Sequence, residues 1–323
     1  MPAATMEIMD IGVFIAAEPH ERGPAEDLHE MIDLAQAVEE LGYRSLYTAS
    51  RHFSSGYAAV PSPLVLFAAV AERTKTLEFG PSVITLPLES LHRLAEDFAT
   101  LDAISGGRAI LGVGSGDDPP AFEAMGVEFD ERAGMLSQNI GKFLDILQGG
   151  DLGAGLTLYP PIENPLDRVA LGAQSARGAS WAASLGIGLQ QGRSEPNSWD
   201  PTVSQVRAAE AYRAVHPNGR ISTARNAWIG SPDDPELWEG IRRHDEFLKA
   251  RGRAGLPEDP KEALRKMNIR TGTPEGLAID LKGAVASIKP DELLITPDPG
   301  GLEASDRLKR LTALAEAFGL GGS

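Results

Sequence analysis

The chain contains no cysteine among its 323 residues. This absence excludes disulfide bonds, thiolate metal sites and cysteine nucleophiles, and it fits the reducing cytoplasm, where we expect the protein to act. Long apolar runs are also lacking, and because a membrane-spanning helix needs about 18 to 20 consecutive apolar residues, we expect no membrane segment. The first residues do not combine a basic start with an apolar core, so the sequence predicts no secretory signal.

Positive charge is scarce, since 30 Lys and Arg stand against 46 Asp and Glu and give a net charge of -16. A chain this acidic is poorly suited to a phosphate backbone, so we expect no nucleic-acid partner. Any anionic ligand must be held by local backbone amides and a few cations. No histidine and carboxylate spacing indicates a metal site, and no Gly-x-Ser-x-Gly sequence indicates a hydrolase. Redox chemistry would therefore need an organic cofactor.

Residues 77–118 form one complete strand, helix and strand unit by pattern. The segment 77–86 is apolar and β-branched, which is typical of a parallel strand covered on both faces. Apolar residues within 91–101 recur at spacings of three and four, which predicts a helix with one apolar face. Gly106 ends that helix, and 109–114 forms a second buried strand. Ligands of such units bind at the loops that follow the strands.

Strand and helix patterns alternate along the chain, as in parallel α/β proteins. Eight strands with helices between them favour a closed barrel, which needs roughly 250 residues before insertions. The expected strands are residues 8–14, 45–48, 77–85, 109–114, 168–172, 187–190, 223–229 and 292–296. The predicted fold class is α/β, a (β/α)8 TIM barrel that forms a single domain over residues 1–323.

Two stretches exceed what a minimal barrel requires. Residues 149–167, rich in Gly and Pro, follow the fourth expected strand, and residues 230–273, with a polar helix at 236–251, follow the seventh. A long insertion after a barrel strand lies over the mouth where ligands bind, so we expect residues 230–273 to form a lid. An outer structural layer without a gating role is the alternative.

The sequence Gly112-Val113-Gly114-Ser115-Gly116 follows a strand and suggests a dinucleotide-binding loop. The Rossmann fingerprint G-x-G-x-x-G, counted from Gly112, needs a third glycine at position 117 and then a helix that faces a pyrophosphate. Asp117, Asp118 and two prolines stand there instead, so two carboxylates would repel a diphosphate and the prolines would interrupt the turn into the helix. We therefore reject the Rossmann interpretation and keep two others, a backbone cradle beside a flat ring or single phosphate, and a tight barrel turn.

Several motifs at ordered spacings resemble one family. LGYRSLYTASRHF at 41–53, PSPLVLFAAVAER at 61–73 and FEAMGVEFDER at 122–132 are similar to the bacterial luciferase-like flavin-dependent monooxygenases. The resemblance covers most of the first 150 residues and resumes at 171–192 and 273–318. It implies a (β/α)8 barrel that binds reduced FMN at the C-terminal ends of its strands.

Position by position, the resemblance implies a cofactor site with two ends. Ser82–Val83 matches a strand end where the family often has a non-proline cis peptide against the flavin ring, and Gly114–Ser115 would form the other edge. The turn at 174–178 matches the family's phosphate-binding turn, and amides at a helix N-terminus suit an anion. Arg193 would add a forked positive charge, with a surface salt bridge as the alternative. The expected cofactor-binding residues are Ser82, Val83, Gly114, Ser115, Gln174, Ser175, Ala176, Gly178 and Arg193.

His52 and Arg51 are the expected catalytic pair. They lie in Ser50-Arg51-His52-Phe53, where the family commonly has Glu-His-His-Phe. Histidine transfers protons near neutral pH, and an arginine neighbour would favour its neutral, base-competent form. The family's catalytic histidine is often the one replaced here by Arg51, which argues against aldehyde oxidation of the luciferase kind. Ser115 is a further departure, because some members place a phosphate-binding arginine there.

The leading functional hypothesis is a two-component FMN-dependent monooxygenase. A separate flavin reductase would supply reduced FMN, and this chain would use it with oxygen to oxidise a small organic substrate, with the protein excluding water. The first alternative is hydride transfer with a deazaflavin coenzyme, since related reductases resemble residues 105–117. The second is a flavin-binding protein without catalysis, suggested by the altered Ser50–Arg51 pair. Apolar helix faces at 61–71 and 91–101 match the family's dimer helices, so we expect a homodimer.

Overall fold

The computed structural model describes residues 9–16, 23–53, 60–193, 201–251, 254–297, 302 and 304–321. Ten strands in this part of the chain form one sheet in which every pairing is parallel. They are β1 (Asp10–Ile15), β2 (Ser45–Thr48), β3 (Glu78–Pro81), β4 (Ile84–Thr85), β5 (Leu111–Gly114), β6 (Val169–Gly172), β7 (Gly188–Gln191), β8 (Ile221–Ile229), β9 (Ile269–Gly272) and β10 (Glu292–Thr296).

The sheet closes into a barrel because one wall position is shared by two short strands. β3 pairs with β2, whereas β4, two residues further on, pairs with β5. Phe79 of β3 also bridges to Ala109, and its carbonyl accepts a hydrogen bond from the Ile110 amide at 2.9 Å. β10 lies between β1 and β8 and completes the circle. The predicted (β/α)8 barrel with insertions after its fourth and seventh wall strands is confirmed.

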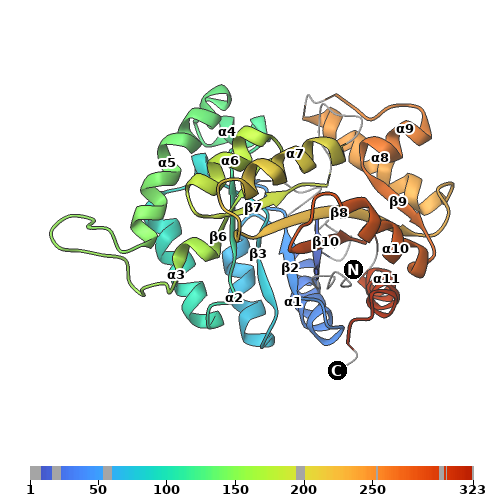
Figure 1. Cartoon of the computed structure of the whole chain (residues 1–323), viewed down its shortest axis with the longest axis horizontal. Helices are drawn as coiled ribbons and strands as arrows, with labels where there is room; N and C mark the ends of the chain where they lie inside the picture. The colour runs from blue at the N-terminus through green and yellow to red at the C-terminus, as the bar shows by residue number, and fades with distance from the viewer. Residues whose placement is uncertain are drawn as a thin grey trace, which may run out of the picture.

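The helices cover the outside of the barrel (Figure 1). The α-helices are α1 (Pro24–Glu40), α2 (Pro63–Arg73), α3 (Leu91–Ser105), α4 (Pro119–Ala124), α5 (Arg132–Leu147), α6 (Ala176–Ser184), α7 (Pro201–Arg213), α8 (Pro235–Ala250), α9 (Pro260–Lys266), α10 (Pro274–Val285) and α11 (Ala304–Phe318). Short 3-10 turns, η1 (Leu86–Leu88), η2 (Phe129–Glu131) and η3 (Pro165–Arg168), lie between them. α3 ends as predicted, because Gly106 adopts the left-handed conformation with φ 67°.

Side chains alternate between two apolar layers along each strand. The outer layer, which includes Val13, Leu46 and Leu111, packs against the helices. The inner layer fills the middle of the barrel and is small, comprising Phe14, Ala16, Tyr47, Ile110, Ala224 and Leu294. Below it, at the N-terminal ends of the strands, the barrel floor is polar: Ser222 donates a hydrogen bond to buried Glu292 at 2.7 Å. This division leaves polar groups at the lower end of an otherwise packed barrel.

The two long stretches differ in structure. Residues 151–164 form a loop without a helix or strand that projects beside α5, and it contains a cis Tyr159–Pro160 peptide bond (Figure 1). Residues 230–273 hold α8, α9 and β9, and β9 extends the sheet by pairing with the upper half of β8. The polar helix expected at 236–251 corresponds to α8. β9 was not among the predicted strands, because Ile269-Arg270-Thr271-Gly272 is short and carries only one buried apolar side chain.

Candidate functional site

The residues expected to bind a cofactor all lie at the C-terminal ends of barrel strands. Ser82 and Val83 follow β3, Gly114 ends β5 with Ser115 after it, the 174–178 turn follows β6, and Arg193 follows β7. Ser82, Val83, Ser115 and Gln174 are half-buried, and Gly172, the last residue of β6, is exposed. Backbone at this end of the barrel is therefore accessible, whereas the strands beneath it are buried.

Val83 is the centre of a tight set of strand ends. The Ser82–Val83 peptide is cis, as the resemblance implies. A Cβ atom at Gly114 would lie 2.7 Å from Cγ2 of Val83, and one at Gly172 would lie 2.9 Å from its Cγ1. Only glycine fits at these two positions while Val83 keeps its place. The glycines of the loop after β5 therefore let the backbone approach Val83 closely, which is a role the sequence interpretation of a tight turn did not specify.

The turn after β6 is built as a helix N-terminus. Ser175 is the N-cap of α6, and its hydroxyl accepts a hydrogen bond from the Gly178 amide at 3.1 Å. Ser175 and Ala176 are exposed, so the amide end of the helix faces solvent. The Gln174 side chain lies against the end of β7, because a Cβ at Gly192 would be 2.5 Å from its Nε2. Its Oε1 is buried and has no hydrogen-bond partner among the described residues.

Arg193 points into the barrel mouth. Its guanidinium lies over the Phe14 ring, 4.8 Å from the centroid, and its Nη1 donates to Oδ1 of Asn226 at 3.4 Å. Asn268 donates from its side chain to the Arg193 carbonyl at 3.0 Å. The position over Phe14 brings this cation to the top of the inner apolar layer. Gln174, which lies against Gly192, and Arg193 are therefore both located at the end of β7.

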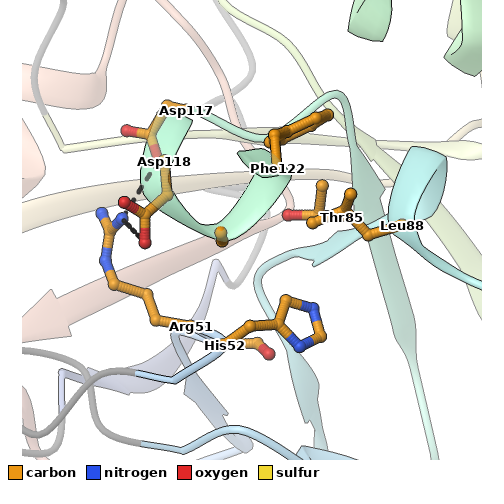
Figure 2. Close-up of a pocket in the computed structure, with 9 residues that line it drawn as sticks. Arg51, His52, Thr85, Leu88, Asp117, Asp118 and Phe122 are labelled. Atoms are coloured by element: carbon orange, nitrogen blue, oxygen red, sulfur yellow. Dashed lines mark hydrogen bonds and ion pairs between the residues drawn. The ribbon is translucent and has the colours of Figure 1, made fainter. Parts of the chain in front are cut away.

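Arg51 and His52 line a small pocket at the opposite side of the mouth (Figure 2). Its lining consists of Ser50, Arg51, His52, Thr85, Leu88, Asp117, Asp118, Ala121 and Phe122. Nη1 of Arg51 lies 3.3 Å from Asp117 and 3.7 Å from Asp118, and Figure 2 shows the His52 ring turned away from this ion pair. Arg51 therefore contacts the acidic loop after β5 and not the imidazole that it was expected to influence.

Glu89 is the acidic group nearest to His52. Nε2 of His52 lies 3.8 Å from Oε1 of Glu89, and both side chains are largely buried. Burial raises the pKa of Glu89, and the nearby His52 partly opposes this shift. The sequence interpretation missed Glu89, although it stands directly before the predicted helix at 91–101. A carboxylate between a strand end and a helix start was the available signal.

The insertion after β8 reaches the same pocket. Phe247 of α8 lies between two guanidinium groups, with Arg251 at 4.0 Å and Arg51 at 5.1 Å from its ring centroid. Arg251 also donates to Oδ1 of Asp118 at 2.8 Å. The end of α8 is therefore fixed to the loops after β2 and β5.

The loop after β5 differs from its expected form at the two prolines. We expected Pro119 and Pro120 to interrupt the turn into a helix, but α4 begins at Pro119. Proline is favourable in the first helical turn, where its missing amide would have had no partner. This part of the argument against a dinucleotide loop is wrong, although the two carboxylates stand: Asp118 pairs with arginines and leaves no room for a diphosphate at its position.

The described part of the chain contains neither a metal centre nor a membrane-spanning helix. No three His, Asp or Glu side chains there come together as a metal centre would require. No helix within the same residues has the length and apolar character needed to cross a membrane.

A parallel (β/α)8 barrel with accessible strand ends, a helix N-terminus and two arginines at its C-terminal mouth has the form of a cofactor-dependent barrel enzyme. The family is identified by a sequence model: residues 9–285 match the luciferase-like monooxygenases, and the chain belongs to this family. Proteins similar to this chain include an F420-dependent dehydrogenase and a monooxygenase solved in complex with FMN.

Curated relatives support the family at moderate identity. The protein YwcH of Bacillus subtilis is 32% identical over 249 residues, which is 74% of each chain. The 4-hydroxyprotoasukamycin monooxygenase of Streptomyces nodosus subsp. asukaensis is 32% identical over 38% of this chain and 33% of its own. An F420-dependent glucose-6-phosphate dehydrogenase of Amycolatopsis mediterranei is 37% identical over 34% of this chain and 35% of its own. Matches to the first three curated relatives span only 41%, 40% and 33% of those proteins.

Solved structures agree on the fold. The monooxygenase RslO1 of Streptomyces bottropensis superposes with a TM-score of 0.80 at 19% identity, over 95% of this chain and 98% of its own. The oxygenating constituent of 3,6-diketocamphane monooxygenase of Pseudomonas putida, in complex with FMN, gives 0.71 at 16% identity, over 96% and 99%. At such identities the likeness establishes the barrel alone.

Proposed function

We propose that this chain is an FMN-dependent monooxygenase that receives reduced FMN from a separate flavin reductase and uses oxygen to oxidise a small organic substrate. The observation that carries the proposal is the accessible set of strand ends around Val83, opposite Gln174 and Arg193. Reduced FMN, when bound, supplies the electrons that activate oxygen. The protein's own residues bind and orient this cofactor, keep water out and hold protons.

The ring of the flavin would rest on the strand ends. Ser82, Val83, Gly114 and Ser115 form one wall there, and Gly172 leaves exposed backbone beside Val83. A flat ring needs a flat apolar contact with few polar groups.

The phosphate of FMN would bind at the start of α6. Ser175 caps the Gly178 amide, and the exposed start of α6 at Ala176, with the helix dipole, favours an anion. Gln174 lies beside this turn, and its Nε2, located at the end of β7, is a donor that would suit a phosphate oxygen. Arg193 provides positive charge in a chain that is acidic overall.

Proton handling would fall to His52. Its Nε2 lies 3.8 Å from Oε1 of Glu89, and because burial raises the pKa of Glu89, this carboxyl keeps its proton to higher pH than an exposed one. Arg51, held by Asp117 and Asp118, acts as a positioning residue for the pocket wall and not on the imidazole. α8, fixed to Asp118 through Arg251, would exclude water from this pocket as the proposed lid.

Hydride transfer with the deazaflavin F420 is the second candidate. The likeness to an F420-dependent glucose-6-phosphate dehydrogenase favours it, at 37% identity over 120 residues. FMN and F420 differ in both ring and side chain, so their relative affinities for the chain distinguish the two candidate functions.

The decisive experiment compares cofactors on the purified chain. We expect FMN to quench or gain fluorescence on binding with a lower Kd than F420, and reduced FMN to be reoxidised by oxygen more slowly when bound than when free. Tighter binding of F420 would favour hydride transfer. Binding of FMN without any change in its reoxidation, and without turnover of a substrate panel, would favour a flavin-binding protein.

Riboflavin, which lacks the phosphate, gives a matched control for the α6 site. Ser175→Ala and Arg193→Met should each weaken FMN binding about tenfold, or about 1.4 kcal/mol, and leave riboflavin binding unchanged. Ser184→Ala, at the other end of α6, should change neither affinity, because its hydroxyl only bonds the Trp181 carbonyl. Equal losses for FMN and riboflavin would contradict the placement of the phosphate.

We further propose a homodimer, since α2 and α3 expose Val65 (72%) and Ile104 (46%) on the outside of the barrel. Apolar side chains this exposed on adjacent helices are suited to an interface.

A further inference from the structure

A second cavity lies at the other end of the barrel. It has a volume of about 490 Å³ and opens between η3, the starts of β6 and β7, and the turn before β8. Ligand pockets are commonly about 300 to 1,000 Å³, so this space holds a small organic molecule. The proposed FMN site is at the C-terminal ends of the strands, whereas this cavity opens at their N-terminal ends and reaches inward to Tyr47 and Gln190.

Gln190 is the inner polar group of the cavity. Its side chain is 4% exposed, lines the cavity, and makes no hydrogen bond through either Nε2 or Oε1 within the described residues. It extends across to β5, because a Cβ at Gly112 would lie 2.4 Å from its Oε1. A buried amide without partners destabilises the folded chain, so a donor and an acceptor in the cavity would stabilise it.

Gln191, the next residue in β7, is a buried glutamine with only a structural role. Gln191 is 2% exposed, donates to the Gln205 carbonyl at 2.9 Å and accepts from the Thr223 hydroxyl at 2.7 Å. Two adjacent glutamines of β7 are therefore similarly buried. The side chain of Gln191 has its hydrogen bonds made within the chain, whereas that of Gln190, which faces the cavity, does not. The amide of Gln190 is available to a ligand.

The charged groups at the entrance are already balanced. Arg220 lies 2.6 Å from Glu78 and 3.2 Å from Glu292, and Arg168 lies 4.0 Å from Asp102. Asp167 adds a further negative charge to the lining. An anion would have to displace these carboxylates, whereas an uncharged molecule would not. Tyr47 and Ile110 supply apolar surface at the inner end, which suits a ring.

We propose that this cavity binds an uncharged small molecule that pairs a ring with a carboxamide or a similar donor and acceptor group. The carboxamide would exchange two hydrogen bonds with Gln190, and the ring would lie against Tyr47 and Ile110. The site is separate from the proposed cofactor site and does not depend on the monooxygenase function.

Nicotinamide is a suitable probe, and nicotinate, which has the same ring and a negative charge, is its matched control. We expect ligand-observed NMR titration of the purified full chain to detect nicotinamide binding, with nicotinate at least tenfold weaker. Gln190→Met, which keeps the side-chain length and removes both polar atoms, should weaken nicotinamide binding at least tenfold. Gln191→Met should lower the thermal unfolding temperature and leave nicotinamide binding unchanged.

Ala170→Val, which fills space in the same cavity, should reduce binding by itself and serves as the test if Gln190→Met does not fold. A crystal soaked in nicotinamide should show the carboxamide at Gln190. Ordered water alone at Gln190, no binding by the wild-type chain, or binding that saturating FMN abolishes and Gln190→Met leaves intact would each overturn the proposal. Each of these outcomes concerns where nicotinamide binds, and none tests whether the chain binds FMN, so the two proposals fail separately.

Discussion

Nε of Arg251 donates a hydrogen bond to Oδ1 of Asp118 at 2.8 Å, across 133 positions of sequence. The bond joins the end of α8 to the loop after β5, and both side chains are mostly buried. Asp118 also lies 3.7 Å from Arg51, so one carboxylate fixes two loops and the insertion around the pocket. The wall of the pocket on this side is held by charge pairs more than by apolar packing.

Replacing Arg251 should loosen the insertion. Arg251→Met removes a charge-assisted hydrogen bond of a partly buried pair and should lower the free energy of unfolding by about 2 kcal/mol. Hydrogen exchange of the α8 amides should become faster than in the wild type, while exchange in α2 stays the same. Arg242→Met, on the exposed face of α8 beside Glu239 and Glu246, is the control and should cost less than about 0.5 kcal/mol. Unchanged α8 exchange in Arg251→Met would show that other contacts hold the insertion.

Two glycine-to-alanine substitutions should have opposite effects. Gly114→Ala places a Cβ 2.7 Å from Val83 and should destabilise the chain by about 1 to 3 kcal/mol, with weaker FMN binding because Val83 must move. Gly134→Ala, within α5, meets no atom within 4 Å and should stabilise the chain by about 0.5 to 1 kcal/mol. Denaturant unfolding measures both. An unchanged free energy of unfolding in Gly114→Ala would mean that Val83 can move away from the new Cβ at little cost.

Arg108 should be essential for stability although it lies in a motif that resembles cofactor-binding sequences. Its guanidinium donates to the carbonyls of Ala71 and Thr74 at 2.9 and 3.1 Å, and it lies over the Phe79 ring at 5.2 Å. Arg108→Lys keeps the charge but loses the planar guanidinium that donates to both carbonyls, and should lower the free energy of unfolding by about 2 to 4 kcal/mol. FMN affinity of the folded fraction should be unchanged. A large loss of FMN affinity without a loss of stability would assign Arg108 to the cofactor site.

Glu89 makes stability depend on pH. Because burial raises its pKa in the folded state, the folded chain holds this proton to higher pH than the unfolded chain, and stability falls as pH rises through the raised value. Glu89→Gln should therefore be more stable than the wild type above neutral pH, and the difference should shrink as the pH falls below the ordinary value of 4.5. Urea unfolding across this range measures it. Glu96→Gln, an exposed partner of Arg93, is the control and should show no such trend.

Most of the barrel could be predicted because buried parallel strands leave a strong apolar signal. The segment 292–296 matches β10, and 45–48 matches β2. The prediction at 77–85 treated β3 and β4 as one strand, since a change of pairing partner leaves no mark on hydrophobicity. β9 was not predicted, because it has only one buried side chain and therefore lacks the apolar run of a buried strand.

The candidate site was predictable in position and less so in contacts. Resemblance placed Ser82–Val83, the 174–178 turn and Arg193 at strand ends, and in the structure they follow β3, β6 and β7. Glu89 and Arg251 could not be found, because their roles depend on how loops far apart in sequence meet. Gln190 carried a signal that was overlooked: a polar residue inside a buried strand needs either a partner or a ligand.

The division of one barrel wall strand into β3 and β4 has a consequence for variation in this fold. Above Thr48, β2 has no neighbour on this side, since β4 pairs with β5 alone. The segment that carries Arg51 and His52 is consequently released from the ladder of the sheet. Substitutions there can reshape one side of the mouth without breaking an interstrand hydrogen bond. The change of partner between β3 and β4 therefore separates the part of the barrel that must stay constant from a part that can vary in sequence.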